Sequence, residues 1–186
     1  MSDPTSSRGP HPASAPADGD RAAAYAEALA RIRLLIDDEP DWVAAMATVV
    51  CELHQAFGHY DWTGFYRVVP NVRTGEPELA IGPYQGGHGC LRIAFGRGVC
   101  GAAAARRETQ LVPDVEAFPG HIACSETTRS EIVVPVLRPD GTVLAVLDVD
   151  SNLPDAFHAS DRAALEELCQ ELGARYGDSP PPPAGR

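Results

Sequence analysis

The sequence has 186 residues with 15 Lys and Arg against 26 Asp and Glu, which gives a formal net charge of −11. The length predicts one domain with tails, and the acidic balance disfavours nucleic acid and anionic membranes as partners, because both attract basic surfaces. No apolar run approaches the roughly 18 residues of a membrane span, and the first residues lack the basic and apolar segments of a secretory signal. We therefore expect a cytoplasmic protein.

Both ends of the chain differ in composition from its middle. Residues 1–19 and 177–186 are rich in Pro, Ala, Ser and Gly and are predicted to be disordered tails around a domain of residues 20–176. Apolar residues at helical spacing predict a first helix over about 20–37. A second helix is predicted with Pro40 in its first turn, and its apolar stripe consists of Trp42, Met46, Val49, Leu53 and Phe57.

The pattern then changes to short β-type runs broken by Gly and Pro. Strands and one Ala-rich helix are predicted in the order strand 62–69, strand 78–84, strand 91–95 and helix 99–107. After an irregular stretch, the turn sequence RPDG joins two more strands, 130–137 and 143–150. Ser160 is predicted to cap a last helix with Leu165, Leu168, Cys169 and Leu172 on one face. This order predicts an α+β domain.

The five cysteines fall into two groups. An odd number excludes a complete disulfide framework within the chain, and we expect reduced thiols at rest. Cys51 and Cys169 lie in predicted helices, where free cysteine usually acts as a small buried hydrophobe. Cys90, Cys100 and Cys124 lie in glycine-rich or polar segments, where reactive residues are commonly displayed. A thiol at a helix N-terminus or beside a histidine has a lowered pKa, which favours a nucleophilic thiolate in this second group.

A zinc site is an alternative interpretation of the same segments. His88, Cys90, Cys100, His121 and Cys124 together offer enough ligands for a tetrahedral zinc ion. Their His-x-Cys and His-x-x-Cys spacings match neither the paired Cys-x-x-Cys motif nor the zinc-finger pattern. We therefore expect neither a metal ion nor a cofactor.

Carboxylates form a second candidate constellation. Asp148 and Asp150 are two residues apart on a predicted strand and so face the same side, and Glu131 on the neighbouring strand could approach them. Crowded carboxyl groups raise one another's pKa, so that one can remain protonated as a general acid. Alternatively, the acids end the strand in solvent. Trp62 and Tyr66 also share one face of a strand, as the wall of a pocket or as ordinary core.

Five motifs stand in a fixed order: DWTGFY, IGPYQG, GRGVCG, GHIACSETTRSEIVVPV and AVLDVDS. With them the sequence resembles the free methionine-(R)-sulfoxide reductases, a GAF-domain family, over about residues 20–176. The resemblance implies a six-stranded antiparallel sheet with helices packed on it, a closed pocket and a homodimer. The alternatives are a GAF module that senses a ligand or redox state, and a zinc-stabilised interaction domain.

The resemblance also implies roles for the cysteines of the second group. Cys124 attacks the sulfur of free methionine-(R)-sulfoxide, and Cys90 resolves the resulting sulfenic acid as a disulfide. Cys100 is a second or alternative partner, and thioredoxin restores the thiols.

The resemblance also implies that acids and aromatic rings bind the substrate. Glu131, Asp148 and Asp150 hold the substrate and assist protonation. Trp62 and Tyr66 form the wall around its methyl group.

Overall fold

The computed structural model describes residues 18–120 and 126–178. In this part of the chain the helices are α1 (Asp18–Leu35), α2 (Trp42–Ala56), α3 (Gly98–Arg106) and α4 (Ala159–Tyr176), with a 3-10 helix at Val115–Ala117. The strands are β1 (Trp62–Pro70), β2 (Pro77–Gln85), β3 (Arg92–Ala94), β4 (Gln110–Val112), β5 (Ser130–Leu137) and β6 (Val143–Ser151).

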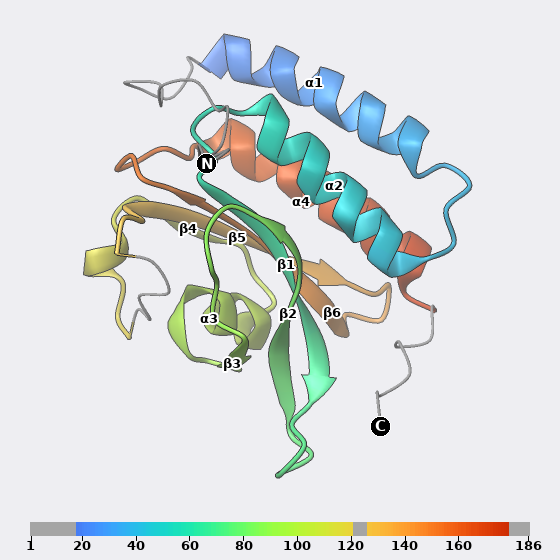
Figure 1. Ribbon diagram of the computed structural model, residues 1–186, viewed down its shortest axis with the longest axis vertical. Coiled ribbons are helices and arrows are strands. Elements are labelled where there is room, and N and C mark those ends of the chain that lie inside the picture. Colours follow the sequence, from blue (N-terminus) through green and yellow to red (C-terminus); the bar gives the residue numbers. More distant parts are fainter. Residues whose placement is uncertain (1–17, 121–125, 179–186) are drawn as a thin grey trace, which may run out of the picture.

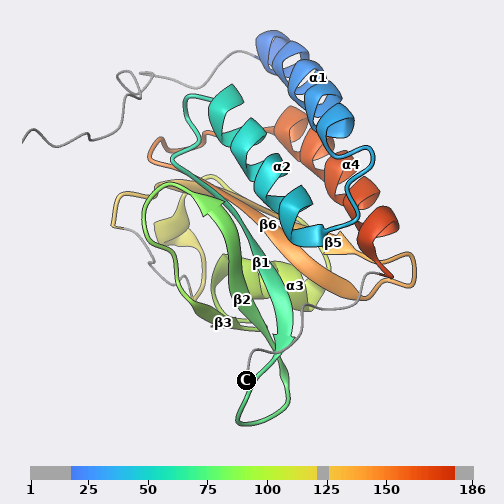
Figure 2. The same ribbon diagram turned by 45° about the vertical axis from the view of Figure 1, so that its right-hand side comes forward.

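All strands belong to one six-stranded sheet in the order β3-β2-β1-β6-β5-β4, and every neighbouring pair is antiparallel. Helices α2 and α4 lie on one face of this sheet with α1 across them, and α3 lies on the opposite face (Figure 1, Figure 2). The α+β class and the six-stranded antiparallel sheet are therefore confirmed. No helix in the described ranges combines the length and the apolarity needed to cross a membrane.

The sequence pattern did not predict one strand, and it placed the ends of several elements incorrectly. Strand β4 is an edge strand of three residues in the stretch that looked irregular, and so short a strand shows no alternation. Helix α1 begins at Asp18, so the predicted first tail extends two residues too far. The rest of that tail and residues 179–186 of the other lie outside the described residues. The RPDG turn is present, with Gly141 at a φ of 82°.

Two predicted helix starts are wrong, because carboxylates do the capping. Helix α2 begins after Asp41, whose side chain accepts hydrogen bonds from the backbone N–H groups of Val43 and Ala44, so Pro40 precedes the cap. Helix α4 begins after His158, whose N–H donates to Asp161 at 2.7 Å. Ser160 therefore lies inside the first turn of α4.

A buried ion pair ties α1 to the start of α4. Arg21 Nη1 lies 2.6 Å from Asp161 Oδ2, and both side chains are fully buried. The hydroxyl of Tyr25 donates to the other oxygen of Asp161 at 2.9 Å and also pairs with Tyr60. Removing either charge would leave its partner buried and uncompensated, which typically costs about 3–5 kcal/mol.

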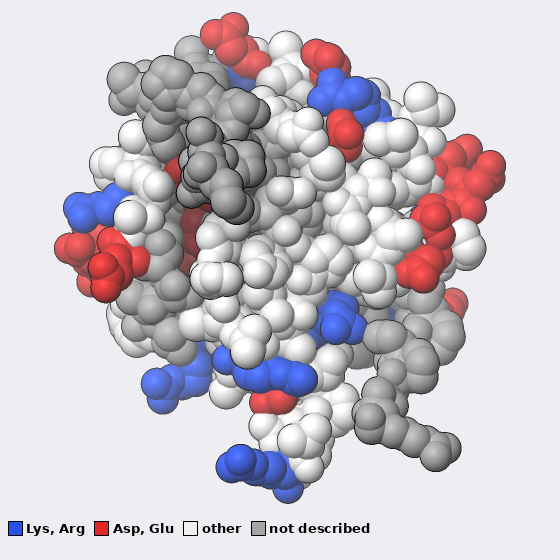
Figure 3. Space-filling model, viewed as in Figure 1, with Lys and Arg blue, Asp and Glu red and all other residues white. Residues whose placement is uncertain are grey.

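Charges of both signs are interspersed on the outer surface. On the face shown in Figure 3, Arg side chains lie among Asp and Glu. Arg33, for example, bridges α1 to Glu167 and Glu171 on α4. Such exposed pairs contribute little to stability, about 0–1 kcal/mol each, so the packed faces of the sheet hold the fold together.

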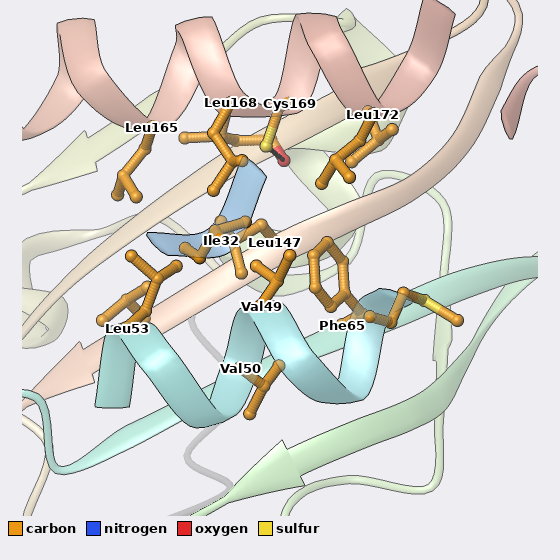
Figure 4. Close-up of a cluster of buried hydrophobic side chains, with 14 of the residues drawn as sticks. Ile32, Val49, Val50, Leu53, Phe65, Leu147, Leu165, Leu168, Cys169 and Leu172 are labelled. Atoms are coloured by element: carbon orange, nitrogen blue, oxygen red, sulfur yellow. Dashed lines mark hydrogen bonds between the residues drawn. The ribbon is translucent and has the colours of Figure 1, made fainter. Parts of the chain in front are cut away.

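The alternation of β-strand side chains divides the core into two layers. Beneath α1, α2 and α4, apolar side chains from the helices meet those of the sheet; Figure 4 shows among others Ile32, Val49, Leu53, Phe65, Leu147, Leu165 and Leu172. Cys169 is buried in this layer as predicted, whereas Cys51 is only partly buried. The second layer lies between the sheet and α3 and includes Trp62, Tyr66 and Cys100.

Candidate active site

The second layer contains a pocket between α3 and the sheet. A thiol and three carboxyl groups of its lining come from three different elements: Cys100 on α3, Glu131 on β5, and Asp148 and Asp150 on β6. The two aspartates point to one side, as the spacing of two residues predicts. Glu131 is the partner of Asp150 in the sheet register, which brings the three carboxyl groups together.

Helix α3 carries Cys100 to the acids because it packs closely on the chain before it. Gly98 has a φ of 59°, and a Cβ atom at Gly101 would lie 2.4 Å from the carbonyl oxygen of Ala94. Glycine is therefore required at Gly101 for this approach. The Cys100 Sγ atom lies 3.1 Å from Asp148 Oδ2 and 3.9 Å from Glu131 Oε1.

The carboxyl groups differ in their tendency to ionise. Burial, followed by repulsion from Asp148 and Asp150, raises the pKa of Glu131 well above its usual value. Burial also raises the pKa of Asp150, although this side chain is partly exposed at its surface and solvent weakens the effect. Burial raises the pKa of Asp148 to about 6, and hydrogen bonds from Cys100 and Glu131 limit that rise. The hydrogen bonds favour ionisation of Asp148 before that of Glu131, whose pKa is raised by burial and by repulsion from Asp148.

The thiol of Cys100 does not have the lowered pKa expected at a helix N-terminus. Burial, with Asp148 and Glu131 as further causes, raises its pKa well above the usual value. The expectation is wrong for this residue because desolvation and two nearby acids outweigh the helix dipole, which contributes only modestly. Cys100 is therefore a protonated thiol, 4% exposed, at neutral pH.

A stack of aromatic rings on β1 and β2 lies beside the acids, with Trp62 as the register partner of Asp150. The ring centroid of Trp62 lies 5.7 Å from that of Tyr66 and 5.4 Å from that of Tyr84. A Cβ atom at Gly64 would lie 2.4 Å from the Trp62 ring, so glycine lets the indole fold across β1. Trp62 Nε1 donates to the carbonyl oxygen of Gly87 at 3.1 Å and so links the wall to the glycine-rich loop. Trp62 and Tyr66 serve both as core and as pocket lining, which makes both interpretations of them correct.

Sequence reasoning missed several residues in and around the pocket. Tyr84 supports the lining residue Trp62 by stacking on it, and Tyr84 is the register partner of Gly64 on β2, so its place in the motif IGPYQG was an available signal. Arg97 and Thr128 also line the pocket. They lie in loops, where no periodicity indicates which way a side chain points.

The described cysteines differ in their oxidation state. Cys90 is disulfide-bonded, so the expectation that all five thiols are reduced is wrong for this residue. Cys51, Cys100 and Cys169 are free. Cys124, to which the resemblance gives the attacking role, lies outside the described residues, as does His121.

The described residues offer one set of side chains that could hold a metal ion. One ligand atom each from Cys100, Glu131 and Asp148 lie within 4.8 Å of one another. This trio differs from the set considered for zinc, because Cys90 is disulfide-bonded and is no thiolate ligand.

The carboxyl cluster predicts an unusual pH dependence of stability. When the pKa of an acid is higher in the folded than in the unfolded state, the folded protein binds more protons between the two values, and stability falls as the pH rises. The pH range in which stability falls begins near the unfolded pKa values of about 4. For Asp148 it extends to the folded pKa of about 6, and for Glu131 and Asp150 it extends to their raised folded pKa values.

Urea unfolding between about pH 5 and about pH 8 measures this slope. Glu131→Gln should flatten it relative to the unsubstituted protein. Equal slopes in the two proteins would contradict the assignment of a raised pKa to Glu131.

A six-stranded antiparallel sheet with a pocket beneath a short helix is the architecture of a GAF domain, and residues 41–176 match the family model of that domain. Free methionine-R-sulfoxide reductase from Neisseria meningitidis, solved in complex with its substrate, is 45% identical, with a TM-score of 0.78 and coverage of 90% of this chain and 96% of that chain. The enzyme of this name from Saccharomyces cerevisiae is 40% identical over 73% of this chain and 76% of its own length. That from Escherichia coli is 35% identical over 80% and 86%. The chain belongs to the free methionine-R-sulfoxide reductase family of GAF-domain proteins.

Proposed function

We propose that this protein reduces free methionine-(R)-sulfoxide to methionine by thiol chemistry. Membership of the family supports the reaction, and one structural observation carries the assignment to this pocket. Glu131 and Asp148 line the same pocket as the aromatic rings of Trp62 and Tyr66, and burial raises the pKa of both carboxyl groups. Reduction of a sulfoxide needs an acid to protonate the oxygen, and a free amino acid needs an anion to hold its ammonium group.

The two electrons come from Cys124 and Cys90. The thiolate of Cys124 attacks the sulfur of the protonated sulfoxide and forms an S–S bond with it. The oxygen then moves from the substrate sulfur to the Cys124 sulfur as this S–S bond breaks, which releases methionine and leaves Cys124 as a sulfenic acid. The thiol of Cys90 then attacks the Cys124 sulfur, which forms a disulfide and releases water. Cys90 is disulfide-bonded in this structure, which suits a role in disulfide chemistry.

Distance along the chain supports a place for Cys124 at this pocket. Thr128, four residues later, lines the pocket. Four residues span at most about 14 Å even when fully extended. Gly89, the neighbour of Cys90, also lines the pocket. Each cysteine of the proposed disulfide is therefore within four residues of a lining residue in the sequence.

The pocket offers a separate group for each part of the substrate. Asp148 Oδ1 is buried without a hydrogen-bond partner, which suits an ammonium donor, and Asp150 adds a second carboxyl group nearby. Backbone N–H groups at the start of α3, where Gly98 and Val99 line the pocket, can hold the carboxylate. The cavity measures ≈ 40 Å³ with Cys90 disulfide-bonded.

Three further parts of the proposal rest mainly on the family resemblance. Thioredoxin reduces the Cys90–Cys124 disulfide, the protein acts in the cytoplasm, and it forms a homodimer. Free thiols at Cys51, Cys100 and Cys169 suit a reducing compartment. Sedimentation of the purified protein measures the oligomeric state directly.

An epimer-resolved assay tests the proposed activity. With thioredoxin, thioredoxin reductase and a nicotinamide reductant, free methionine-(R)-sulfoxide should be turned over, because each turnover consumes one disulfide reduction. The S epimer should be reduced at least about 100-fold more slowly, since a misplaced oxygen loses the proton donor, an effect of about 10²–10⁴. Folded, reduced protein that turns over neither epimer would instead favour a sensing GAF module.

A further inference from the structure

The thiol of Cys100 remains unexplained by the disulfide chemistry, although it lines the pocket. It is free, 4% exposed, and 3.1 Å from the Oδ2 atom of Asp148. We propose that Cys100 is a positioning residue: its S–H group donates a hydrogen bond to Asp148 and holds that carboxyl group as the anion of the pocket, and Cys100 takes no part in disulfide exchange. This inference rests on the proposed function.

Burial argues against a redox role for Cys100. Disulfide exchange needs a thiolate with access to the sulfur that it attacks. The Cys100 thiol is protonated at neutral pH, because burial and the neighbouring acids Asp148 and Glu131 raise its pKa. Cys90 contrasts with it, since it is already disulfide-bonded and lies partly exposed in the glycine-rich loop.

Geometry argues for the role of donor. A protonated thiol has one hydrogen to donate, and the nearer of the two acceptors is Asp148, at 3.1 Å against 3.9 Å for Glu131. Hydrogen bonds from Cys100 and Glu131 both favour the charged form of Asp148 and lower its pKa relative to burial alone. Two donors on one carboxylate settle which acid of the cluster carries the charge.

The surroundings of Asp148 make this donor necessary. The titratable or charged side chains that line the pocket around it come from β1, the glycine-rich loop, the start of α3, β5 and β6: Tyr66, His88, Arg97, Cys100, Glu131 and Asp150. Of the acids, Glu131 and Asp150 oppose a charge on Asp148 by repulsion when they ionise. Arg97 and His88 are exposed to solvent, which screens their attraction.

A matched pair of substitutions separates a donor from a redox thiol. Cys100→Ser keeps a hydroxyl donor, whereas Cys100→Ala removes the donor and keeps a good helix former in α3. Without the donor, Asp148 binds a proton more readily. The acid limb of the kcat/KM profile should therefore move upward by about one pH unit in Cys100→Ala, as expected from loss of one charged hydrogen bond. In Cys100→Ser it should move by less than about half a unit.

Both variants should continue through many turnovers with reductant, as should the control Cys51→Ser on α2. A stop after one equivalent of methionine in both Cys100 variants would overturn the inference, because it would mark Cys100 as an exchanging thiol. An unchanged profile in Cys100→Ala, or equal shifts in Ala and Ser, would also overturn it. In an Asp148→Asn background, Cys100→Ala should produce no further shift, and a persisting shift would contradict the pairing.

An infrared measurement separates failure of this inference from failure of the proposed function. The S–H stretching band of Cys100 is the band that disappears in Cys100→Ser. It should lie at lower frequency than the band of an unbonded thiol, and in Asp148→Asn it should shift toward the unbonded frequency. This readout needs no substrate. A band at the unbonded frequency overturns the inference, whereas lack of turnover in the unsubstituted protein overturns the proposed function.

Discussion

Cys124→Ser is expected to abolish reduction of free methionine-(R)-sulfoxide, even within a single turnover. A serine hydroxyl is not deprotonated near neutral pH and cannot replace a thiolate, and loss of the nucleophile in an assembled active site typically lowers the rate by about 10⁴-fold or more. Rapid quenching of reduced protein with excess substrate, followed by counting the methionine formed per protein molecule, measures the effect.

Cys90→Ser is the matched variant, because it leaves the attacking thiol intact. It should form one equivalent of methionine and then stall, since no thiol is available to convert the sulfenic acid into a disulfide. A sulfenic-acid probe should label Cys90→Ser after that turnover and should not label Cys124→Ser. Methionine formation by Cys124→Ser at an undiminished rate would show that another cysteine makes the attack.

The architecture was largely predictable, because most of it follows periodic patterns. The apolar stripe of α2 and the apolar runs of β5 and β6 are long enough to identify their elements within one or two residues. The three residues of β4 are too few to show a pattern. Helix starts were missed where a carboxylate such as Asp41 or Asp161 replaced the expected cap.

The site was less predictable, because tertiary packing creates it. Cys100 is separated from Glu131 by 31 residues and from Asp148 by 48, so no local spacing indicates their contact. The same packing reverses the pKa shift expected for Cys100, since burial is a property of the whole fold. The face shared by Asp148 and Asp150 followed from β-strand geometry alone.

Glu131→Gln is expected to lower kcat by about 10²–10⁴-fold, the usual contribution of a general acid. Glu131 is the buried carboxyl group whose pKa is raised by desolvation and by both aspartates, so it keeps its proton where Asp148 has lost its own. Gln preserves the shape and can still donate a hydrogen bond, but it cannot deliver a proton to the sulfoxide oxygen. Substrate affinity should change less than kcat, because Asp148 still meets the ammonium group.

Stability distinguishes this chemical effect from damage to the fold. Above the unfolded pKa, folding must hold a proton on Glu131 that the unfolded chain would release, and a neutral amide removes this cost. The melting temperature of Glu131→Gln at about pH 8 should therefore stay level or rise, by about 2–4 °C for each 1 kcal/mol regained. Glu76→Gln, in the exposed turn between β1 and β2, is the matched control and should change neither rate nor melting temperature. Calorimetry and steady-state kinetics on the same preparations give both quantities. Normal kcat in Glu131→Gln would transfer the role of proton donor to Asp150, the partly exposed acid of the cluster whose pKa is also raised.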